Sequence, residues 1–522
     1  MKKRGKKAIA CALAVGMLCS YGQMAFAEDA ADGKYGGTLT YSPGMQNEQN
    51  LGYPCGDVNM LMNTNAAPAL ETLFRLDSEG NLICWLAESY EVTEDGLQYT
   101  IKLRPDVLFH DGTKMDAEAV VWNIQKNMEN GKSQFAKIAS VEATDELTVT
   151  IKMSESDILL LANLAADPSG LIVSPTAVEE NGIEWAEKNP VGTGPFVFES
   201  WENDVEVVYT RNENYWGVDA DGNQLPYLDG IHCIYMTENA VAEAALEAGE
   251  VQVWTRADAD SVPKFEGREG FATSKSEVPS SNINLVPCLN TDNPTASKEF
   301  REAVNHAIDF DAIVEGLFGI NCVVTNQNSV EGRIYHNDEI PKKEYDPEKA
   351  KELLEQAGYN GEELVIYGDN GVMNEKLLTA MVPYLEAVGI KTRIELLGTG
   401  AYFSMLTEEF KDGFLVGYYG YAPHEFGKMY SLASASANLP VANFSMDDET
   451  YQMFEDARTS ASTEASAEIV RELQKRIYET NLYLISVATT YDLVIQNTEA
   501  ADCGFCTLGG GRWTPESAYI VK

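Results

Sequence analysis

Helices and strands alternate along the second half of this chain, and that alternation limits the possible folds more than any other sequence feature. From Ser280 onward, periodicity and turn residues predict strands at residues 283–285, 364–367, 390–396 and 414–419, and helices over residues 300–310, 311–317, 346–357, 374–388 and 463–478. Asp346 and Pro347 are typical of a helix start. Because repeated alternation is typical of α/β proteins, this half predicts an α/β lobe with a partly parallel sheet.

The first half of the chain is richer in turns and short strands. Residues 98–103 (QYTIKL) alternate in polarity, which predicts a strand, and residues 144–151 predict an alternating hairpin. Asp116 is placed to cap a following helix. Apolar residues at helical spacing predict a helix over residues 68–76. Residues 239–249 predict a helix that ends on Gly249. The Gly/Pro-rich residues 190–195 indicate a crossing between domains.

The N-terminus has the three parts of a secretory signal peptide. Five basic residues precede the apolar stretch 8–18, and residues 25–27 (AFA) form an A-x-A cleavage site. We therefore expect residues 1–27 to be removed and residues 28–35 to form a flexible leader. Two alternatives stay open, an uncleaved membrane anchor and a lipoprotein processed at Cys19. In each case the chain is secreted across the cytoplasmic membrane and acts in the periplasm, at the cell surface or outside the cell.

The 522-residue chain is strongly acidic. Its formal net charge is −43, which becomes −48 when the five basic residues within residues 1–27 are removed. Such a surface repels nucleic acid at long range, so we expect no nucleic-acid partner. The net charge does not by itself predict a cationic ligand, because it does not report the charge inside a cleft.

Cysteine and histidine usage gives little sign of a metal site. Seven cysteines follow residue 27, and an odd number leaves at least one thiol unpaired within the chain or paired between chains. Cys503 and Cys506 form a single C-x-x-C motif, which predicts a local disulfide or two free thiols. None of the five histidines is spaced as a metal ligand, so we predict neither a metal nor a cofactor.

Two long stretches are similar to one protein family in particular. Residues 71–126 (ETLFRLDSEGNLICWLAESYEVTEDGLQYTIKLRPDVLFHDGTKMDAEAVVWNIQK) and 189–216 (NPVGTGPFVFESWENDVEVVYTRNENYW) resemble the family 5 solute-binding proteins of bacterial ABC importers. Residues 300–309 (FREAVNHAID) and 345–359 (YDPEKAKELLEQAGY) resemble two further motifs of that family, so the similarity covers roughly residues 36–500. Proteins of this family capture peptides, nickel complexes and other solutes.

The resemblance implies an α/β, two-lobed fold of the periplasmic-binding-protein type (type II, cluster C) with an extra domain II. Domain I would comprise residues 36–67, 196–285 and 490–522, domain II residues 68–195, and domain III residues 286–489. The resemblance also implies that domain I closes against domain III on the solute. A ligand that contacts both lobes only in the closed state shifts the population toward that state.

The resemblance places the ligand between the lobes, where the strongest candidates lie at the end of the predicted strand 414–419 and just after it. They are Tyr418, Tyr419, Tyr421, His424 and Glu425. In peptide-binding members an Asp of this loop pairs with the α-ammonium of the peptide, but no Asp lies between Gly413 and Phe444. His424 or Glu425 falls near its place. The three tyrosines suit sugar, aromatic or cationic ligands, and packing between strands is their competing interpretation.

Five further residues are weaker candidates for ligand binding, and scaffold packing is the favoured interpretation of each: Tyr41, Ser42, Asn282, Asn284 and Tyr402. The first two end the first predicted strand, and the two asparagines lie at the crossing into domain III. Residues 110–113 (HDGT) could suggest a metal or acid–base pair, but we interpret them as a tight turn.

Together these features predict a solute-binding protein that is not an enzyme. We expect a monomer that captures a peptide-like solute and delivers it to ABC permease subunits at the membrane. The sequence contains no G-x-S-x-G, H-E-x-x-H, P-loop or G-x-G-x-x-G motif. Two alternatives stay open because the expected Asp is missing and the fold serves several roles. They are a non-peptide ligand (oligosaccharide, amine or metal chelate) and a solute sensor that does not transport.

Overall fold

The computed structural model describes residues 33–43, 50–58, 62–290, 292–407, 411–420, 425–435, 445–505 and 513–522. At residues 372–374, 399, 403, 407 and 418–420 only the backbone is described. The predicted signal peptide, Cys19 and Cys506 lie outside the described residues, so the inferences about them stay predictions. Among the helices of the described residues, none combines the length and the apolar character that a membrane span requires.

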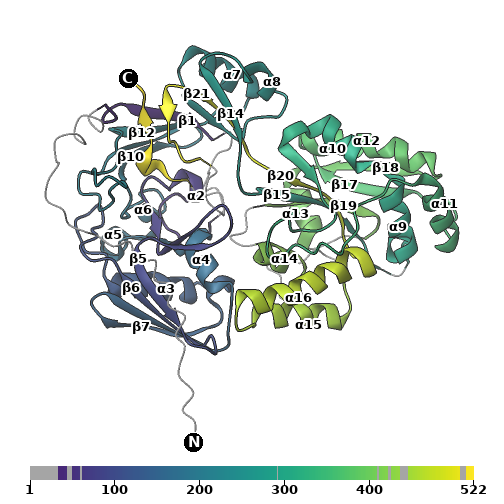
Figure 1. The fold of residues 1–522 in the computed structure, drawn as a ribbon, viewed down its shortest axis with the longest axis horizontal. Coiled ribbons are helices and arrows are strands. Elements are labelled where there is room, and N and C mark those ends of the chain that lie inside the picture. Colours follow the sequence, from purple (N-terminus) through teal and green to yellow (C-terminus); the bar gives the residue numbers. More distant parts are fainter. Residues whose placement is uncertain are drawn as a thin grey trace, which may run out of the picture.

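A seven-stranded sheet forms the centre of the first lobe (Figure 1). In spatial order its strands are β10 (Phe196–Glu202), β11 (Glu206–Arg211), β12 (Gly230–Ile234), β1 (Thr38–Ser42), β13 (Val253–Thr255), β21 (Leu493–Asn497) and β14 (Phe271–Lys275). β1 pairs in parallel with β12 and β13, and the other pairs are antiparallel. Helices α7 (Asn239–Ala248) and α8 (Val262–Phe265) belong to this part of the lobe, and α7 ends on Gly249 as predicted.

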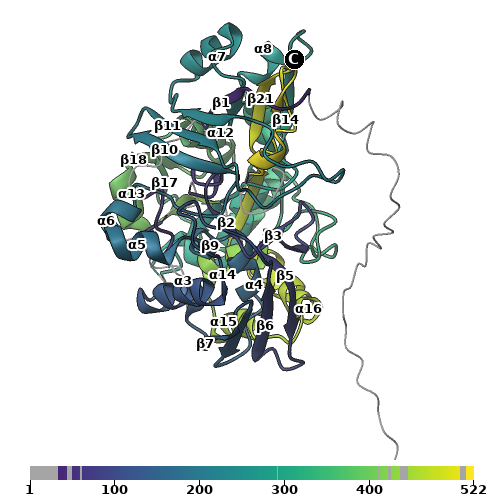
Figure 2. The same cartoon turned by 90° about the vertical axis from the view of Figure 1, so that its left-hand side faces the viewer.

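A four-stranded antiparallel sheet lies in the same lobe, below the seven-stranded sheet in Figure 2. Its strands in order are β5 (Ala87–Val92), β6 (Gln98–Leu103), β8 (Thr148–Met153) and β7 (Ile138–Asp145). Helix α3 (Ala117–Glu129) packs on it, and the Asp116 carboxylate caps α3 by accepting from the Ala119 N–H at 3.0 Å. The remaining helices here are α2 (Met62–Asn65), α4 (Leu160–Ala166), α5 (Pro175–Asn181) and α6 (Ile183–Ala186).

Residues 68–76 do not form the predicted helix. They contain the short strands β2 (Glu71–Thr72) and β3 (Phe74–Leu76), which pair with β9 (Leu171–Ile172) and β4 (Leu82–Cys84). Every residue of this segment is buried. Because it is enclosed on all sides, the spacing of its apolar residues cannot distinguish a helix from a strand.

A six-stranded sheet forms the centre of the second lobe. Its strands in order are β16 (Cys322–Val324), β20 (Ile485–Thr490), β15 (Ser281–Pro287), β19 (Phe414–Gly420), β17 (Leu364–Asp369) and β18 (Thr392–Leu397). β17 pairs in parallel with β18 and β19, and the other pairs are antiparallel. This is the partly parallel sheet that the sequence predicts.

Helices cover both faces of the six-stranded sheet. One layer holds α9 (Lys298–Ala307), α10 (Phe310–Phe318), α11 (Pro347–Gln356) and α12 (Val372–Ala387), and it packs on Ile283 and Leu285 of β15. The other layer holds α13 (Thr399–Thr407), α14 (Glu425–Ala433), α15 (Asp448–Arg458) and α16 (Thr463–Lys475), and it packs on Val286 and Leu415. Two helix layers around one sheet are the arrangement expected of an α/β lobe.

Two chain segments connect the lobes side by side. Residues 276–280 lead from β14 to β15, and residues 491–492 lead back from β20 to β21 (Figure 1). The N–H of Ser280 donates to the Thr490 carbonyl at 2.8 Å, and the N–H of Ser276 donates to the Asp492 carbonyl at 2.8 Å. We call residues 276–280 and 491–492 the crossing segments. Two short paired segments of this kind can absorb the backbone rotation of hinge closure.

The lobes also touch at a second place, between the end of α15 and the loop before α4. Asp157 and Arg458 form a buried ion pair across this contact, with 2.6 Å between Oδ2 and NH2. The side chains are 1% and 10% exposed respectively, and the carbonyl of Arg458 accepts from the N–H of Ile158 at 3.0 Å. In this conformation the lobes are therefore bridged both at the crossing segments and through Asp157.

The predicted domain boundaries stay a prediction. All strands of the seven-stranded sheet come from the segments assigned to domain I, whereas β15 spans the boundary placed between residues 285 and 286.

Tyr35, at the end of the predicted leader, is packed rather than free. Its ring centroid lies 5.2 Å from that of Tyr227, and its hydroxyl donates to the Gln224 carbonyl at 2.6 Å.

Candidate functional site

The alternation of β15 turns two of the predicted site residues toward one helix layer. Ile283 and Leu285 point into the core with α9 to α12, so Asn282 and Asn284 face the layer that contains α14. The two asparagines are 1% and 0% exposed. Because β15 follows directly on a crossing segment, these two buried amides lie on the part of the sheet nearest the other lobe.

Glu425 is the first residue of α14, and its carboxylate meets two groups from the long loop after β16. The Ser329 hydroxyl donates to Oε2 at 2.7 Å, and Nε of Arg333 lies 3.7 Å from Oε1. The side chains of Glu425 and Arg333 are 23% and 17% exposed. The carboxylate is thus oriented by its partners, and the Glu425 side chain is not fully enclosed.

Lys428 lies on α14 three residues after Glu425, and it connects that helix to the sheet. Its ammonium donates to Oδ1 of Asn282 at 3.3 Å, and Nδ2 of Asn282 donates to Oγ1 of Thr489 at 2.9 Å. Lys428 is buried, with 7% of its surface exposed. We call Asn282, Ser329, Arg333, Glu425 and Lys428 the Glu425 cluster.

Burial shifts the titration of the two charged residues of α14. Burial raises the pKa of Glu425, while the Ser329 hydrogen bond and the charges of Arg333 and Lys428 oppose the rise. Burial lowers the pKa of Lys428 to about 8, against the attraction of Glu425. Burial also raises the pKa of Tyr491, which interacts with the charges of both Arg333 and Glu425. The cluster is therefore electrostatically connected to the second crossing segment.

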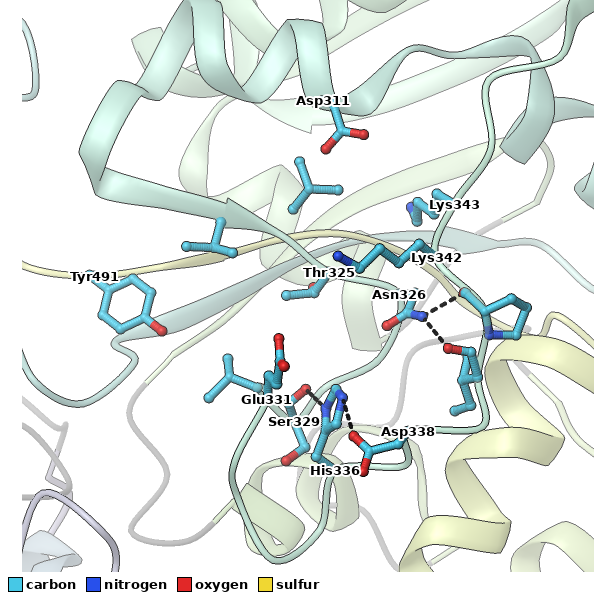
Figure 3. A pocket seen from close by; sticks show the side chains of 15 residues that line it. Asp311, Thr325, Asn326, Ser329, Glu331, His336, Asp338, Lys342, Lys343 and Tyr491 are labelled. Carbon is cyan, nitrogen blue, oxygen red and sulfur yellow. Dashed lines mark hydrogen bonds and ion pairs between the residues drawn. The ribbon is translucent and has the colours of Figure 1, made fainter.

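A cavity of about 710 Å³ borders the cluster (Figure 3). The loop after β16 supplies most of its wall, and Tyr491 of the crossing segment lies on the opposite side from Asn326 and Lys342. Ser329 lines the cavity and also donates to Glu425, so it connects the two. The cavity volume lies in the range of about 300–1,000 Å³ that is usual for small-molecule sites.

Charged side chains of both signs line this cavity. The acidic ones are Asp311, Glu331 and Asp338, and the basic ones are Lys342 and Lys343. His336 also lines it, with Nδ1 at 3.0 Å from the Ser329 carbonyl and Nε2 at 3.5 Å from Oδ1 of Asp338. Together with the Glu425 cluster this lining suits a polar ligand that carries both positive and negative groups.

Three of the weaker candidates are buried. Tyr41 and Ser42 are fully buried in the first lobe, where the ring of Tyr41 packs against Trp513 with 4.7 Å between centroids. Tyr402 is buried under the six-stranded sheet, and its hydroxyl donates to the Val416 carbonyl at 2.9 Å.

For the remaining tyrosine and histidine candidates the structure describes no side chain. Tyr418 and Tyr419 lie near the end of β19, where only the backbone is described, and Tyr421 and His424 lie outside the described residues. Of the ten predicted site residues, the structure connects Glu425 and Asn282 through Lys428. The role of all ten in ligand binding stays a prediction.

Sequence reasoning missed Ser329, Arg333 and Lys428. Ser329 and Arg333 lie in a loop without regular periodicity, and their contacts with Glu425 span more than ninety residues of sequence. A signal for Lys428 was present, because it is the only charged residue within residues 426–434 (FGKMYSLAS). A single charge in an otherwise apolar and small-residue helix indicates a buried ion with a specific partner.

The predicted turn at residues 110–113 is confirmed. Gly112 has a φ of 83°, and Oδ1 of Asp111 accepts from the Thr113 N–H at 2.9 Å. The His110 side chain contacts the backbone, with Nε2 at 3.0 Å from the Gly194 carbonyl oxygen. Over the described ranges, no group of three His, Cys, Asp or Glu side chains is arranged to hold a metal ion.

The sequence is similar to curated proteins named glutathione-binding protein GsiB. It is 31% identical to that of Pectobacterium atrosepticum over 347 residues, which are 65% of this chain and 66% of the relative. It is 31% identical to that of Escherichia coli K12 over 335 residues, which are 63% of this chain and 64% of the relative. The matched region thus spans just under two thirds of the length of these relatives.

Two solved structures show the same fold. The periplasmic binding protein DppA of Helicobacter pylori, in complex with a peptide, gives a TM-score of 0.79 at 23% identity and covers 95% of this chain and 100% of its own. The oligopeptide-binding protein AppA of Bacillus subtilis, in complex with a nonapeptide, gives a TM-score of 0.76 at 18% identity and covers 94% and 100%. These likenesses confirm the predicted fold class.

The profile of the bacterial extracellular solute-binding proteins, family 5, matches residues 81–439. Family membership also confirms the prediction that the chain is not an enzyme, because this is a family of non-catalytic binding proteins. The match covers more than half of the sequence. It includes every residue of the Glu425 cluster but not the crossing segment at residues 491–492. This chain belongs to the bacterial extracellular solute-binding proteins, family 5.

Proposed function

We propose that this protein is the extracytoplasmic receptor of an ABC importer and that its solute is peptide-like. Family membership and the two-lobed fold with paired crossing segments support the receptor role. A receptor of this kind contacts the solute with both lobes and presents the closed form to permease subunits at the membrane. The proposed location is outside the cytoplasmic membrane, in the periplasm or at the cell surface.

The carboxylate of Glu425 is the observation that carries the peptide-like assignment. It stands on α14, just after the loop where peptide-binding members of the family use an Asp for the α-ammonium. Ser329 and Arg333 orient it, and the Glu425 side chain as a whole is 23% exposed. A fixed carboxylate on a partly exposed side chain suits an ammonium group, since charge-assisted hydrogen bonds are stronger than neutral ones.

The names of the curated relatives narrow the proposal further. They are called glutathione-binding proteins, and glutathione is a small peptide that carries one ammonium and two carboxylate groups. The Glu425 cluster has one carboxylate beside the cations Arg333 and Lys428. This arrangement complements a zwitterionic peptide of that size, and we propose glutathione and short peptides as the first solutes to test.

We expect Glu425→Gln to weaken the binding of a peptide-like solute by about 2 kcal/mol or more, because the ligand ammonium would lose its charged partner. The measurement is isothermal titration calorimetry of residues 28–522 with glutathione, trialanine and a longer peptide. Glu355→Gln is the matched control, since Glu355 is an exposed residue on α11 of the same lobe.

A thermal-shift screen separates the proposal from its alternatives. A solute at about 100 times its Kd stabilises the folded chain by about 2.7 kcal/mol. If oligosaccharides, amines or metal chelates shift the unfolding temperature while every peptide and glutathione leave it unchanged, the solute is not peptide-like. If the Glu425→Gln variant and the unchanged chain bind the solute with equal affinity, Glu425 does not contact the solute.

A further inference from the structure

A second cavity lies in the second lobe, away from the crossing segments. Its volume is about 290 Å³, and it lies between α9, the start of β20 and residues 340–343, a segment that also lines the larger cavity. Ser486 in its wall comes five residues before Tyr491, which is about 16 Å along an extended strand. Two exposed side chains, Lys342 and Lys349, also line it, so it opens to solvent. We call it the α9 cavity.

A π-helical turn over Arg476–Thr480 brings two residues to the wall of the α9 cavity, Tyr478 and Glu479. In this turn the N–H of Asn481 donates at 3.0 Å to the carbonyl of Arg476, five residues earlier. Turns of this kind are rare and frequently occur at functional sites. The turn is therefore one indication of a binding site.

Three residues in the wall each have a buried polar atom that no described group hydrogen-bonds. These atoms are the hydroxyl of Tyr478, Oε2 of Glu479 and Oδ1 of Asn305 on α9. Tyr478 is only 6% exposed, and burial raises its pKa, so the hydroxyl keeps its proton and can donate. Buried polar groups in native proteins are normally hydrogen-bonded, so three unpaired ones around one cavity indicate a polar occupant.

Lys343 adds a cation to the same cavity. Its ammonium donates to the Ser486 carbonyl and lies 3.8 Å from the centroid of the Phe310 ring. Asp311, which lines the larger cavity, attracts it, but no described carboxylate forms an ion pair with it. Burial lowers the pKa of Lys343 to about 7. A negative group in the α9 cavity would stabilise the protonated form of this amine.

The occupant that complements these groups carries both a positive and a negative group. Glu479 and Asn305 offer acceptors, which suit an ammonium, whereas Lys343 and Tyr478 offer donors, which suit a carboxylate. Part of the remaining wall is apolar and consists of side chains that are at most 5% exposed: Leu482, Leu484 and Ile485. The cavity volume lies just below the range of about 300–1,000 Å³ that is usual for drug-sized ligands, so the cavity suits a molecule smaller than a tripeptide.

We propose that the α9 cavity binds a free α-amino acid with an apolar side chain, at a site separate from that of the transported solute. Its ammonium binds Glu479 and Asn305, its carboxylate binds Lys343 and Tyr478, and its side chain packs on the apolar wall. All residues that line the cavity belong to the second lobe, so binding there needs no closure of the lobes. The inference goes beyond the proposed function and does not depend on it.

The first test compares L-leucine with two compounds that each lack one of its charged groups, on the unchanged protein. Isocaproate lacks the ammonium, and isoamylamine lacks the carboxylate. In isothermal titration calorimetry we expect leucine to bind at least about 10-fold more tightly than either compound, because each of them loses one set of charge-assisted hydrogen bonds. If alanine, valine, leucine and methionine all fail to bind at millimolar concentration, water alone fills the cavity and the inference is wrong.

The second test changes the π-helical turn. Tyr478→Phe removes one hydroxyl and Glu479→Gln removes one charge, and we expect each to weaken leucine binding about 10-fold while the affinity for glutathione and trialanine stays unchanged. Glu472→Gln is the matched control, since Glu472 is exposed on the preceding helix α16. Variants that unfold at the wild-type temperature and bind leucine as tightly as the unchanged chain would contradict the inference.

Hydrogen–deuterium exchange locates leucine on the unchanged protein, so it decides even if a variant unfolds early. We expect leucine to slow exchange in residues 302–306 and 478–486 and to leave residues 425–433 unchanged. Protection of residues 425–433 instead would place leucine at the Glu425 cluster and overturn the inference. If the chain binds leucine at the α9 cavity but neither peptides nor glutathione, the proposed function fails and this inference stands.

Discussion

Replacing Glu71 by alanine is expected to lower the free energy of unfolding by about 4 kcal/mol or more, because one buried carboxylate organises four hydrogen-bond donors. Oε1 accepts from Trp85 at 2.7 Å and from Tyr215 at 2.9 Å, and Oε2 accepts from Thr193 at 2.8 Å and from Trp216 at 3.0 Å. Glu71 is 1% exposed.

The donors around Glu71 come from distant parts of the chain, which makes this network a junction of the first lobe. Arg75 lies 3.8 Å from the carboxylate and is held by Glu516 at 2.6 Å, so the C-terminal segment joins the same network. Removal of Glu71 would leave indole and hydroxyl donors unpaired in a buried site, and each such donor costs about 1–3 kcal/mol.

Urea denaturation followed by circular dichroism measures this effect. Glu88→Ala is the matched control, because Glu88 pairs with Lys102 at a position where both side chains are about half exposed. An exposed pair of this kind contributes about 1 kcal/mol at most. If Glu71→Ala shifts the urea midpoint no more than Glu88→Ala does, the network does not hold the lobe together.

The second large effect is expected at the contact between the lobes. Asp157→Asn should destabilise the chain by about 3–5 kcal/mol, because it leaves the charge of Arg458 buried without its partner. The carboxylate is 2.6 Å from Arg458, and its other oxygen accepts from the Leu159 N–H at 3.0 Å. Arg458 also donates to the hydroxyl of Tyr430 at 3.1 Å.

A double-mutant cycle isolates that ion pair. Asp157→Asn with Arg458→Met should be more stable than Asp157→Asn alone, since an apolar side chain is tolerated where an unpaired charge is not. The control is Asp260→Asn at the exposed pair between Asp260 and Lys376, which also links the lobes at 2.9 Å and should change stability by less than about 1 kcal/mol. A coupling energy near zero for Asp157 and Arg458 would contradict the prediction.

Local signals in the sequence predicted helix boundaries in both lobes. Helix starts at Asp116 and Asp346 and the helix end at Gly249 are confirmed, because caps depend on a few adjacent residues. The prediction of a helix over residues 68–76 was wrong because that segment is enclosed on every side. Only its pairing with residues 82–84 and 171–172 decides that it forms strands.

The candidate site was predictable in part. Glu425 was found because it follows the loop that carries the ligand-binding Asp in peptide-binding family members, and Asn282 because it follows the crossing into the second lobe. Their neighbours were not predictable, since Ser329 lies 96 residues from Glu425 and Lys428 lies 146 residues from Asn282 in sequence. A single sequence does not contain the sheet order that brings these residues together.

Hydrogen–deuterium exchange with and without glutathione or a bound peptide tests the central claim most directly. The account predicts that the solute slows exchange in residues 281–287, 325–336, 425–433 and 488–492, which contain the Glu425 cluster and the second crossing segment. A solute that binds but protects other segments, and leaves these four unchanged, would contradict the placement of the site.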